Sequence, residues 1–393
     1  MSRFIAATRA ARVTYTVAIL LSFIALSATP ACSHRREERP RKPATLETPF
    51  WNDTAQFLAG VKGRVDGPFH QLEDTEAWRT YAAEFDETWK AVQKDQFQAV
   101  DAFQKRELSP IQTHGNFVFY PLSGPDVLYA THFFPEGRTF VFAGLERVGH
   151  LRPPENYKAE TLDRQLHGWR VSVDSMFERS FFVTSEMDQE FHGRVADGLL
   201  PMILLLLARG GHTIEQVRYG HLTDGGEFAG EDASDPTFRH PGVEIKFKRG
   251  PEPESRTLYY FSFDLGPAFE RNPSFSRFLQ RQGTPDTLVK SASFLLHWRQ
   301  CKGLREYILE NSNLVLQDDT GVPFRFFRNA EWQVSLFGAY SRPDRPFRRE
   351  YQPDLAEAFH APANVRQLGF SLGYGAGRRP SSMMLAKRVH RRG

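Results

Sequence analysis

Residues 116–149 read NFVFYPLSGPDVLYATHFFPEGRTFVFAGLERVG, and three hydrophobic patterns follow one another within this stretch. Residues 117–121 are a short apolar run typical of a buried strand, residues 123–133 have helical spacing, and residues 138–145 form a second apolar run. This order predicts a strand, helix, strand unit in the core of the protein. It also places the sequence Ser-Gly-Pro-Asp, residues 123–126, at the end of the first strand.

The segment before this unit has the pattern of amphipathic helices. Between residues 73 and 108, an aromatic or aliphatic residue recurs every three or four positions among charged residues. A shorter run with the same spacing begins at Trp51. Residues 50–110 are therefore predicted to form an N-terminal helical region.

The segment after the unit alternates helical and strand patterns. Residues 199–208, LLPMILLLLA, are too few to span a bilayer and predict a buried helix. Residues 243–247 and 258–265 predict a hairpin, 267–282 and 294–311 predict helices, and 287–291, 313–317, 324–327 and 332–337 predict strands, with a last edge strand at 383–386. This alternation indicates the α/β class, or mixed α+β, in which helices flank a central mixed sheet.

The economical interpretation is one α/β body over residues 111–377, followed by a basic C-terminal tail over 378–393. The alternative is two domains divided near the glycine-rich and acidic loop at 223–241.

The first 31 residues have the three parts of an export signal. A basic start precedes the apolar run 13–26, VTYTVAILLSFIAL, and small residues follow. Cys32 comes next, and this arrangement resembles the processing site of bacterial lipoproteins, in which such a cysteine is acylated. The resemblance implies a lipid anchor at Cys32. Residues 32–49 are predicted to be a disordered tether, because from residue 33 they are highly charged, contain three prolines and have no hydrophobic periodicity. Cleavage by an ordinary signal peptidase and an uncleaved anchor remain alternatives.

The charge distribution argues against binding of nucleic acid. Removing residues 1–31, which contain three arginines and no acid, leaves 47 basic and 47 acidic side chains. The basic groups concentrate at the two ends of the chain, so the folded part is acidic. Basic ends fit an anionic membrane or polymer nearby, although solvated tails without a partner are the simpler interpretation.

The chain lacks strong catalytic motifs. It has no GxSxG, HExxH, GxxxxGK[ST] or CxxC sequence, and nothing in it predicts a cofactor. Asp126 follows a strand and is a candidate base or metal ligand, but a capping box with Ser123 as N-cap and Asp126 at N3 is preferred. Because His132 lies about 120° around that helix from Asp126, the two are not expected to pair.

A second candidate is the pair Asp318 and Asp319, directly after an apolar strand. Adjacent carboxylates at a strand end could hold a divalent cation or perform acid–base chemistry, and an ordinary turn is the preferred alternative. His297, in an apolar helix, is more often a packed residue than a catalytic one. Cys301 is likewise interpreted as packing, and the glycine-rich residues 373–379 have no helix after them to make a phosphate loop.

Residues 119–149 and 314–327 resemble stretches of a family of uncharacterised bacterial exported proteins. The resemblance implies a bacterial origin and a shared fold, and it lends no activity. Two hypotheses follow. The first is a cell-envelope lipoprotein that acts by binding or scaffolding, with an envelope protein or glycan as partner. The second is an envelope hydrolase that uses Asp126, Asp318 and Asp319 with His132 or His297.

Overall fold

In a computed structural model of the chain, the predicted strand, helix, strand unit is present at its expected place. Strand β1 (Phe117–Pro121), helix α5 (Val127–Phe133) and strand β2 (Thr139–Gly144) follow in that order. The two strands pair in parallel, with Phe117 opposite Thr139 and Pro121 opposite Ala143. All of β1 is buried, so this unit belongs to the core, as predicted.

The structure describes residues 48–111, 116–151, 154–179, 198–230, 242–343, 345–361, 365–375 and 380–389. The predicted signal peptide (1–31), the predicted acylation site Cys32 and the tether up to residue 47 lie outside these ranges, as do residues 378, 379 and 390–393 of the predicted tail.

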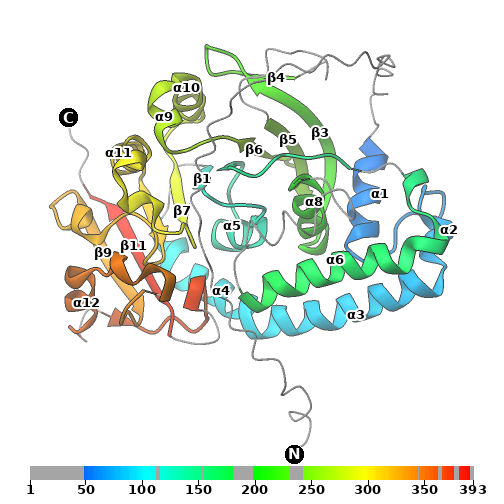
Figure 1. Cartoon of the computed structure of the whole chain (residues 1–393), viewed down its shortest axis with the longest axis horizontal. Coiled ribbons are helices and arrows are strands. Elements are labelled where there is room, and N and C mark those ends of the chain that lie inside the picture. Colours follow the sequence, from blue (N-terminus) through cyan, green and yellow to red (C-terminus); the bar gives the residue numbers. More distant parts are fainter. Residues whose placement is uncertain are drawn as a thin grey trace, which may run out of the picture. The chain divides into compact units, whose positions relative to one another are not determined.

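The described strands form one mixed sheet of eleven, in the order β10-β9-β11-β8-β7-β1-β2-β6-β5-β3-β4 (Figure 1). The centre is parallel and contains β1, β2, β6 (Arg256–Ser262), β7 (Asp286–Val289) and β8 (Leu314–Gln317). An antiparallel extension beside β6 contains β5 (Gly242–Arg249), β3 (His212–Leu222) and β4 (Phe228–Gly230). Since β3 and β5 are neighbours, the loop between them does not divide the sheet into two domains.

The C-terminal strand corrects a prediction. β11 (Ser382–Arg388) was expected at an edge of the sheet, within a basic tail. It instead lies between β8 and β9 (Trp332–Gly338) and is antiparallel to both, while β10 (Val365–Arg366) forms the edge. Met383, Met384, Leu385 and Ala386 are all buried, which explains why the apolar piece enters the sheet.

Helices cover both faces of the sheet because side chains of each strand alternate between two apolar clusters. Val118 and Tyr120 of β1 join the first cluster, and Phe117 and Phe119 join the second. The first face carries α5, α1 (Thr48–Leu58), α3 (Glu76–Val92), α4 (Gln98–Phe103), α6 (Ala159–Arg179) and α8 (Leu200–Arg209), with the short α2 (His70–Glu73). The second face carries α9 (Pro267–Arg271), α10 (Pro273–Gln282), α11 (Lys302–Asn311) and α12 (Pro353–Phe359).

The chain is therefore an α/β protein with a helical N-terminal region, as predicted. That region shares one core with the sheet and is not a separate domain. Every residue of α8 is buried, which confirms the central helix expected at 199–208. Within the described residues, none of the helices combines the length and apolarity needed to cross a bilayer.

Two local predictions were wrong. Residues 324–327 are a 3-10 helix, Phe324–Phe327, and not a strand, because Pro323 sets a turn and the Phe324 N–H donates to Gln352 Oε1 at 2.8 Å. The helix expected from residue 294 begins with two 3-10 turns and becomes α-helical at Lys302. The extended backbone of Trp298 (φ −86°, ψ 154°) interrupts it.

Candidate functional site at the carboxyl edge of the sheet

The order of the parallel strands fixes where the winding of the sheet changes direction. From β1 the chain reaches β2 through α5, and it reaches β6 through α6, α8 and the antiparallel strands β3, β4 and β5. It then reaches β7 and β8 through helices of the second face. β1 and β7 are paired, so the two directions diverge between them. In open α/β sheets a crevice forms at such a switch point, outside the carboxyl ends of the strands, and ligands bind there.

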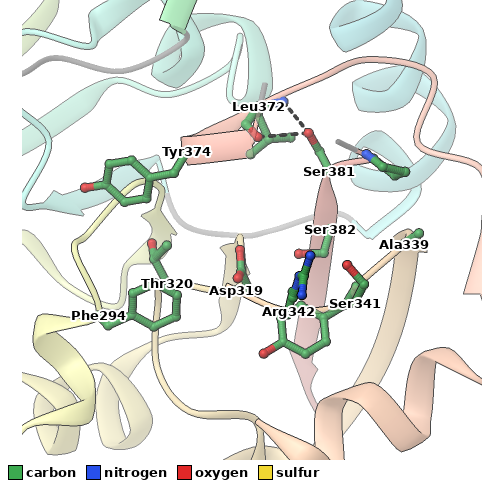
Figure 2. A pocket seen from close by; sticks show the side chains of 12 residues that line it. Phe294, Asp319, Thr320, Ala339, Ser341, Arg342, Leu372, Tyr374, Ser381 and Ser382 are labelled. Carbon is green, nitrogen blue, oxygen red and sulfur yellow. Dashed lines mark hydrogen bonds between the residues drawn. The ribbon is translucent and has the colours of Figure 1, made fainter. Parts of the chain in front are cut away.

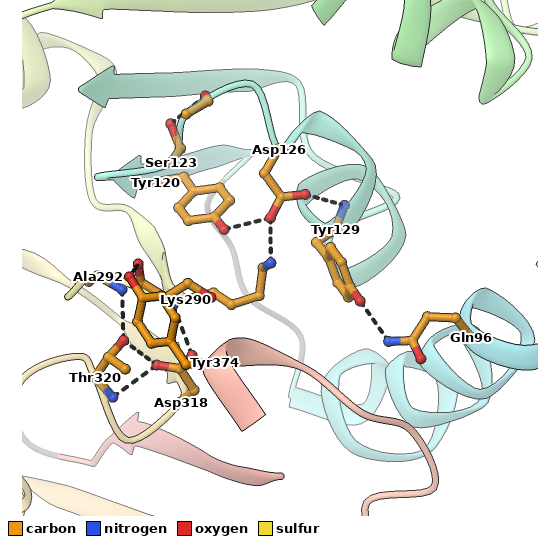
Figure 3. A network of polar contacts seen from close by, with 12 residues as sticks. Gln96, Tyr120, Ser123, Asp126, Tyr129, Lys290, Ala292, Asp318, Thr320 and Tyr374 are labelled. Atoms are coloured by element: carbon orange, nitrogen blue, oxygen red, sulfur yellow. Dashed lines mark hydrogen bonds and ion pairs between the residues drawn. The ribbon is translucent and has the colours of Figure 1, made fainter. Parts of the chain in front are cut away.

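A buried ion pair joins the loops after β1 and β7 (Figure 3). Lys290 Nζ lies 2.9 Å from Asp126 Oδ2, and the two side chains are 3% and 10% exposed. The Tyr120 hydroxyl donates to the same oxygen at 2.8 Å. Burial next to the Asp126 carboxylate raises the pKa of Tyr120, so this hydroxyl stays protonated and donates. The ammonium group of Lys290 also lies 4.2 Å from the centre of the Tyr129 ring.

The helical N-terminal region reaches this cluster through a π-helical segment, Gln93–Phe97, between α3 and α4. Within it, Gln96 Nε2 donates to the Tyr129 hydroxyl at 2.6 Å and to the Ser371 carbonyl at 2.5 Å. A π-helical turn inside an α-helix re-aims a side chain and is frequent at functional sites. Here it ties α3 and α4 to α5 and to the segment that contains Ser371.

Asp318, which follows β8, organises the loop after β7. Its carboxylate accepts from the Ser291 N–H at 2.8 Å, from the Thr320 N–H at 2.9 Å and from the Thr320 hydroxyl at 2.5 Å. Thr320 Oγ1 in turn accepts from the Ala292 N–H at 2.7 Å. Burial raises the pKa of Asp318, and these donors, together with nearby Lys290, oppose the rise.

The backbone at this edge is strained. Among the described residues other than glycine, four have positive φ: Leu122 at 59° after β1, and Ser291 at 53°, Ser293 at 50° and Phe294 at 57° after β7. Residues with side chains avoid this region at a cost of about 1–3 kcal/mol each, and such strain clusters at active sites and ligand clamps. All four lie beside the switch point.

The capping prediction for Asp126 needs a correction. Asp126 is itself the N-cap of α5, where its Oδ1 accepts from the Tyr129 N–H at 3.5 Å. Ser123 Oγ instead donates to the Gly124 carbonyl at 3.1 Å. Asp126 therefore has two structural roles, as a helix cap and as the counter-ion of Lys290.

The two candidate histidines bind other acids. His132 Nδ1 lies 2.6 Å from Asp101 Oδ1 and its ring stacks on Phe97. His297 Nδ1 lies 3.5 Å from Glu350 Oε2, and burial lowers the pKa of His297 to about 4. Within the described part of the chain, neither histidine contacts the carboxylate of Asp126 or Asp318.

Asp319 and Asp318 have different surroundings. Asp319 lines a small pocket of about 40 Å³ with Thr320, Arg342 and Tyr374 (Figure 2). Asp318 is buried, and its carboxylate accepts from Ser291 and Thr320. Across the described residues, no group of three His, Cys, Asp or Glu side chains is arranged to hold a metal.

Tyr374 lines this pocket together with Phe294 and also contacts the loop after β7. Its hydroxyl donates to the Ser291 carbonyl at 2.7 Å and lies 2.7 Å from Ser293 Oγ. Gly373, at φ 74°, packs so closely on Asp318 that an added Cβ would lie 2.7 Å from its Oδ2. The described part of the glycine-rich segment is therefore a cover over Asp318.

Cys301 is buried against the second apolar cluster, and burial raises the pKa of its thiol. This environment suppresses the reactive thiolate.

The sequence pointed to Asp126 and Asp318 but missed Lys290, Ser291 and Tyr374. A lysine directly after the buried strand Asp286–Val289 was the one available signal, because a charge at the end of a buried strand needs a partner. Nothing in the sequence indicates the φ of Ser291 or the distant partner Tyr374.

The fold and site define a doubly wound α/β protein with a charged, strained switch point. Comparison with protein-family models, with curated proteins and with solved structures finds no match to this chain.

Proposed function

We propose that this chain is a binding protein of the bacterial cell envelope whose α/β body holds a small ligand at the switch point. The observation that carries the proposal is the backbone strain at Leu122, Ser291, Ser293 and Phe294. Strained conformations persist only where the surroundings hold them, and they are concentrated where a ligand is bound.

The surrounding contacts support a site that is already organised. The Ser291 N–H donates to Asp318 and the Ala292 N–H donates to Thr320, which fixes the loop after β7 to the loop after β8. The Lys290–Asp126 pair fixes the loop after β7 to the loop after β1. A ligand entering such a crevice meets loops that need little further ordering, which lowers the entropic cost of binding.

A screen of small polar metabolites against two arginine variants tests this proposal. Ser293→Arg places a bulky side chain in the strained loop, and Ser276→Arg places the same group on half-buried Ser276 of α10. Compounds that raise the melting temperature of the wild type should lose their effect with Ser293→Arg and keep it with Ser276→Arg. Urea unfolding of both variants checks that they are folded.

Equal stabilisation of the two folded variants by the same compounds would place the ligand elsewhere. The large groove at the opposite edge, which has a volume of about 540 Å³ and includes Arg305, Trp332 and Arg388, would then be the alternative.

The envelope location rests on the export signal and on Cys32, as does the proposed lipid anchor in the membrane. We propose that residues 32–49 connect that anchor to the folded body. If the protein also acts as a scaffold, the proposed partner is an envelope protein or a glycan.

Labelling with radioactive palmitate should succeed with the wild type and fail with Cys32→Ala, and globomycin should block processing. Release of unlabelled wild-type protein in soluble form would refute the anchor.

The hydrolase hypothesis has less support from the geometry. Asp126 and Asp318 do lie at one edge, but Lys290 and Tyr120 bind the first carboxylate, while backbone N–H groups bind the second. His132 and His297 have other acidic partners. A general base must be free to reach its substrate, so binding is the better account.

A further inference from the structure

We infer, on the basis of the proposed function, that the ligand is a nucleoside with an intact ribose and no phosphate. The inference comes from the residues that follow β1 and β2. In doubly wound sheets the loop after the first strand approaches the ligand closely, and an acid after the second strand, about 20 residues further on, binds the ribose hydroxyls.

Glu146 occupies the position of that acid. It follows the end of β2 by two residues and Gly124 by 22, and its side chain is half-buried. The carboxylate folds back over Gly144, where an added Cβ would lie 2.5 Å from Glu146 Oε2. The Tyr260 hydroxyl, from the neighbouring β6, donates to the Glu146 carbonyl at 2.8 Å and lies 3.5 Å from Glu146 Oε2, so it holds both the turn and the carboxylate in place.

The loop after β1 allows close approach of a ligand. Leu122 and Gly124 both have positive φ, and the Leu122 N–H donates to the Ala143 carbonyl at 2.7 Å. This bond ties the loop to the end of β2, so it lies beside the strand that leads to Glu146. Across the switch point, the Ser291 hydroxyl is buried and makes no hydrogen bond among the described residues. Buried polar atoms in proteins rarely lack a partner, and the proposed ligand would supply one to this hydroxyl.

The same loop excludes phosphate. Residues 122–126 contain no lysine or arginine, and the carboxylate of Asp126 occupies the beginning of α5. In dinucleotide-binding proteins the pyrophosphate lies at that helix terminus. A phosphate placed here would meet a buried carboxylate whose neighbouring cation, Lys290, is already paired with it. A neutral or cationic nucleoside avoids this repulsion.

Calorimetric titration of the purified full chain tests the inference. The phosphate-free probes are adenosine, uridine and the cationic nucleoside S-adenosylmethionine, and the phosphate-bearing probes are AMP and UMP. At least one phosphate-free probe should bind, and the matching nucleotide should bind about tenfold more weakly or worse.

Glu146→Gln should weaken binding of that nucleoside about tenfold or more, since hydrogen bonds to a charged group are the strong ones. The 2′-deoxy analogue should lose a similar factor with the wild type and little more with Glu146→Gln. Glu160→Gln, on the exposed side of α6, is the matched control and should bind as the wild type does.

Nucleotides that bind as tightly as nucleosides, or a 2′-deoxy effect that persists undiminished in Glu146→Gln, would overturn the inference. If no probe binds while other small molecules lose their effect with Ser293→Arg, the nucleoside inference fails and the proposed site stands. If no compound distinguishes Ser293→Arg from Ser276→Arg, both fail.

Discussion

Lys290 and Asp126 form a charge pair in the interior of the protein, where each side chain depends on the other. Lys290→Met removes the ammonium group and leaves the carboxylate buried. We predict a loss of about 3–5 kcal/mol in the free energy of unfolding, measured by urea denaturation, because an uncompensated buried charge is strongly destabilising.

Two further variants show whether the pair is the cause. Lys94→Met, at an exposed position, should change stability little. Adding Asp126→Asn to Lys290→Met should restore part of the loss. If the double variant is no more stable than Lys290→Met, the loss reflects packing of the lysine chain and not its charge.

The backbone of Ser291 is strained, because its φ is positive. Glycine adopts a φ of 53° without the steric cost that a side chain imposes, so Ser291→Gly should raise the free energy of unfolding by about 1 kcal/mol. Ser291→Ala keeps the Cβ and should give no such gain. Both variants lose the hydroxyl and should bind the ligand more weakly. A destabilised Ser291→Gly protein would show that the hydroxyl, and not the strain, dominates at this position.

His212 predicts a pH dependence of stability. Burial lowers its pKa to about 4, from an ordinary value near 6.5, and its Nδ1 lies 3.2 Å from the Leu207 carbonyl. As the pH falls, His212 therefore becomes protonated at a higher pH in the unfolded chain than in the folded protein. The stabilising contribution is complete above pH 6.5 and is lost between pH 6.5 and 4, by about 3 kcal/mol at most.

Urea unfolding at pH 7.5, 5.5 and 4.5 measures this loss in the wild type and in His212→Asn. The asparagine retains an N–H donor for the Leu207 carbonyl and does not titrate, so its stability should fall less steeply. His297, with a pKa also near 4, continues to contribute in both proteins. Identical slopes in the two proteins would contradict a buried neutral His212.

At the scale of elements, β11 makes the clearest prediction. Ending the chain after Ser381 removes a strand from the middle of the sheet, together with the buried Met383, Met384 and Leu385. Each buried apolar side chain contributes about 1.5–3 kcal/mol, which is large beside a total stability of about 5–15 kcal/mol. The shortened protein should not fold.

Circular dichroism and the soluble yield measure the outcome, with a chain ending at Val389 as the control. A folded protein lacking residues 382–393 would show that the sheet forms without β11 and that β11 is not an essential part of its core.

The elements also show which features the sequence could predict. β1, α5, β2, α8 and the β5–β6 hairpin were predictable because their periods are local and their ends carry turn residues. The place of β11 was not, because its neighbours β8 and β9 are distant in sequence and its flanks are basic.

The same reasoning applies to the site. Asp126 and Asp318 were recognisable as polar residues after apolar strands. Their shared environment was not, since it depends on Lys290 lying between them and on the parallel order of β1, β7 and β8. Positive φ at a serine or a leucine has no local signal, because these residues rarely adopt it.

At the scale of the whole molecule, three sets of loops meet at one edge of the sheet, and the helical N-terminal region reaches them through Gln96. The basic residues near Cys32 and the proposed anchor there would hold the folded body near an anionic surface. All residues of the proposed ligand site lie in the folded body, and none lies near the anchor in sequence. The site should therefore bind equally well in the full chain and in its Cys32→Ala variant, as titration of both proteins would show.

Hydrogen–deuterium exchange with the tightest-binding small molecule tests the central claim most directly, because it locates the ligand without any substitution. Slower exchange is predicted in residues 122–126, 290–294 and 318–321, with no change in residues 305–311 and 329–332 at the opposite edge. Protection confined to the opposite edge, with unchanged exchange in the loops after β1, β7 and β8, would contradict a ligand site at the switch point.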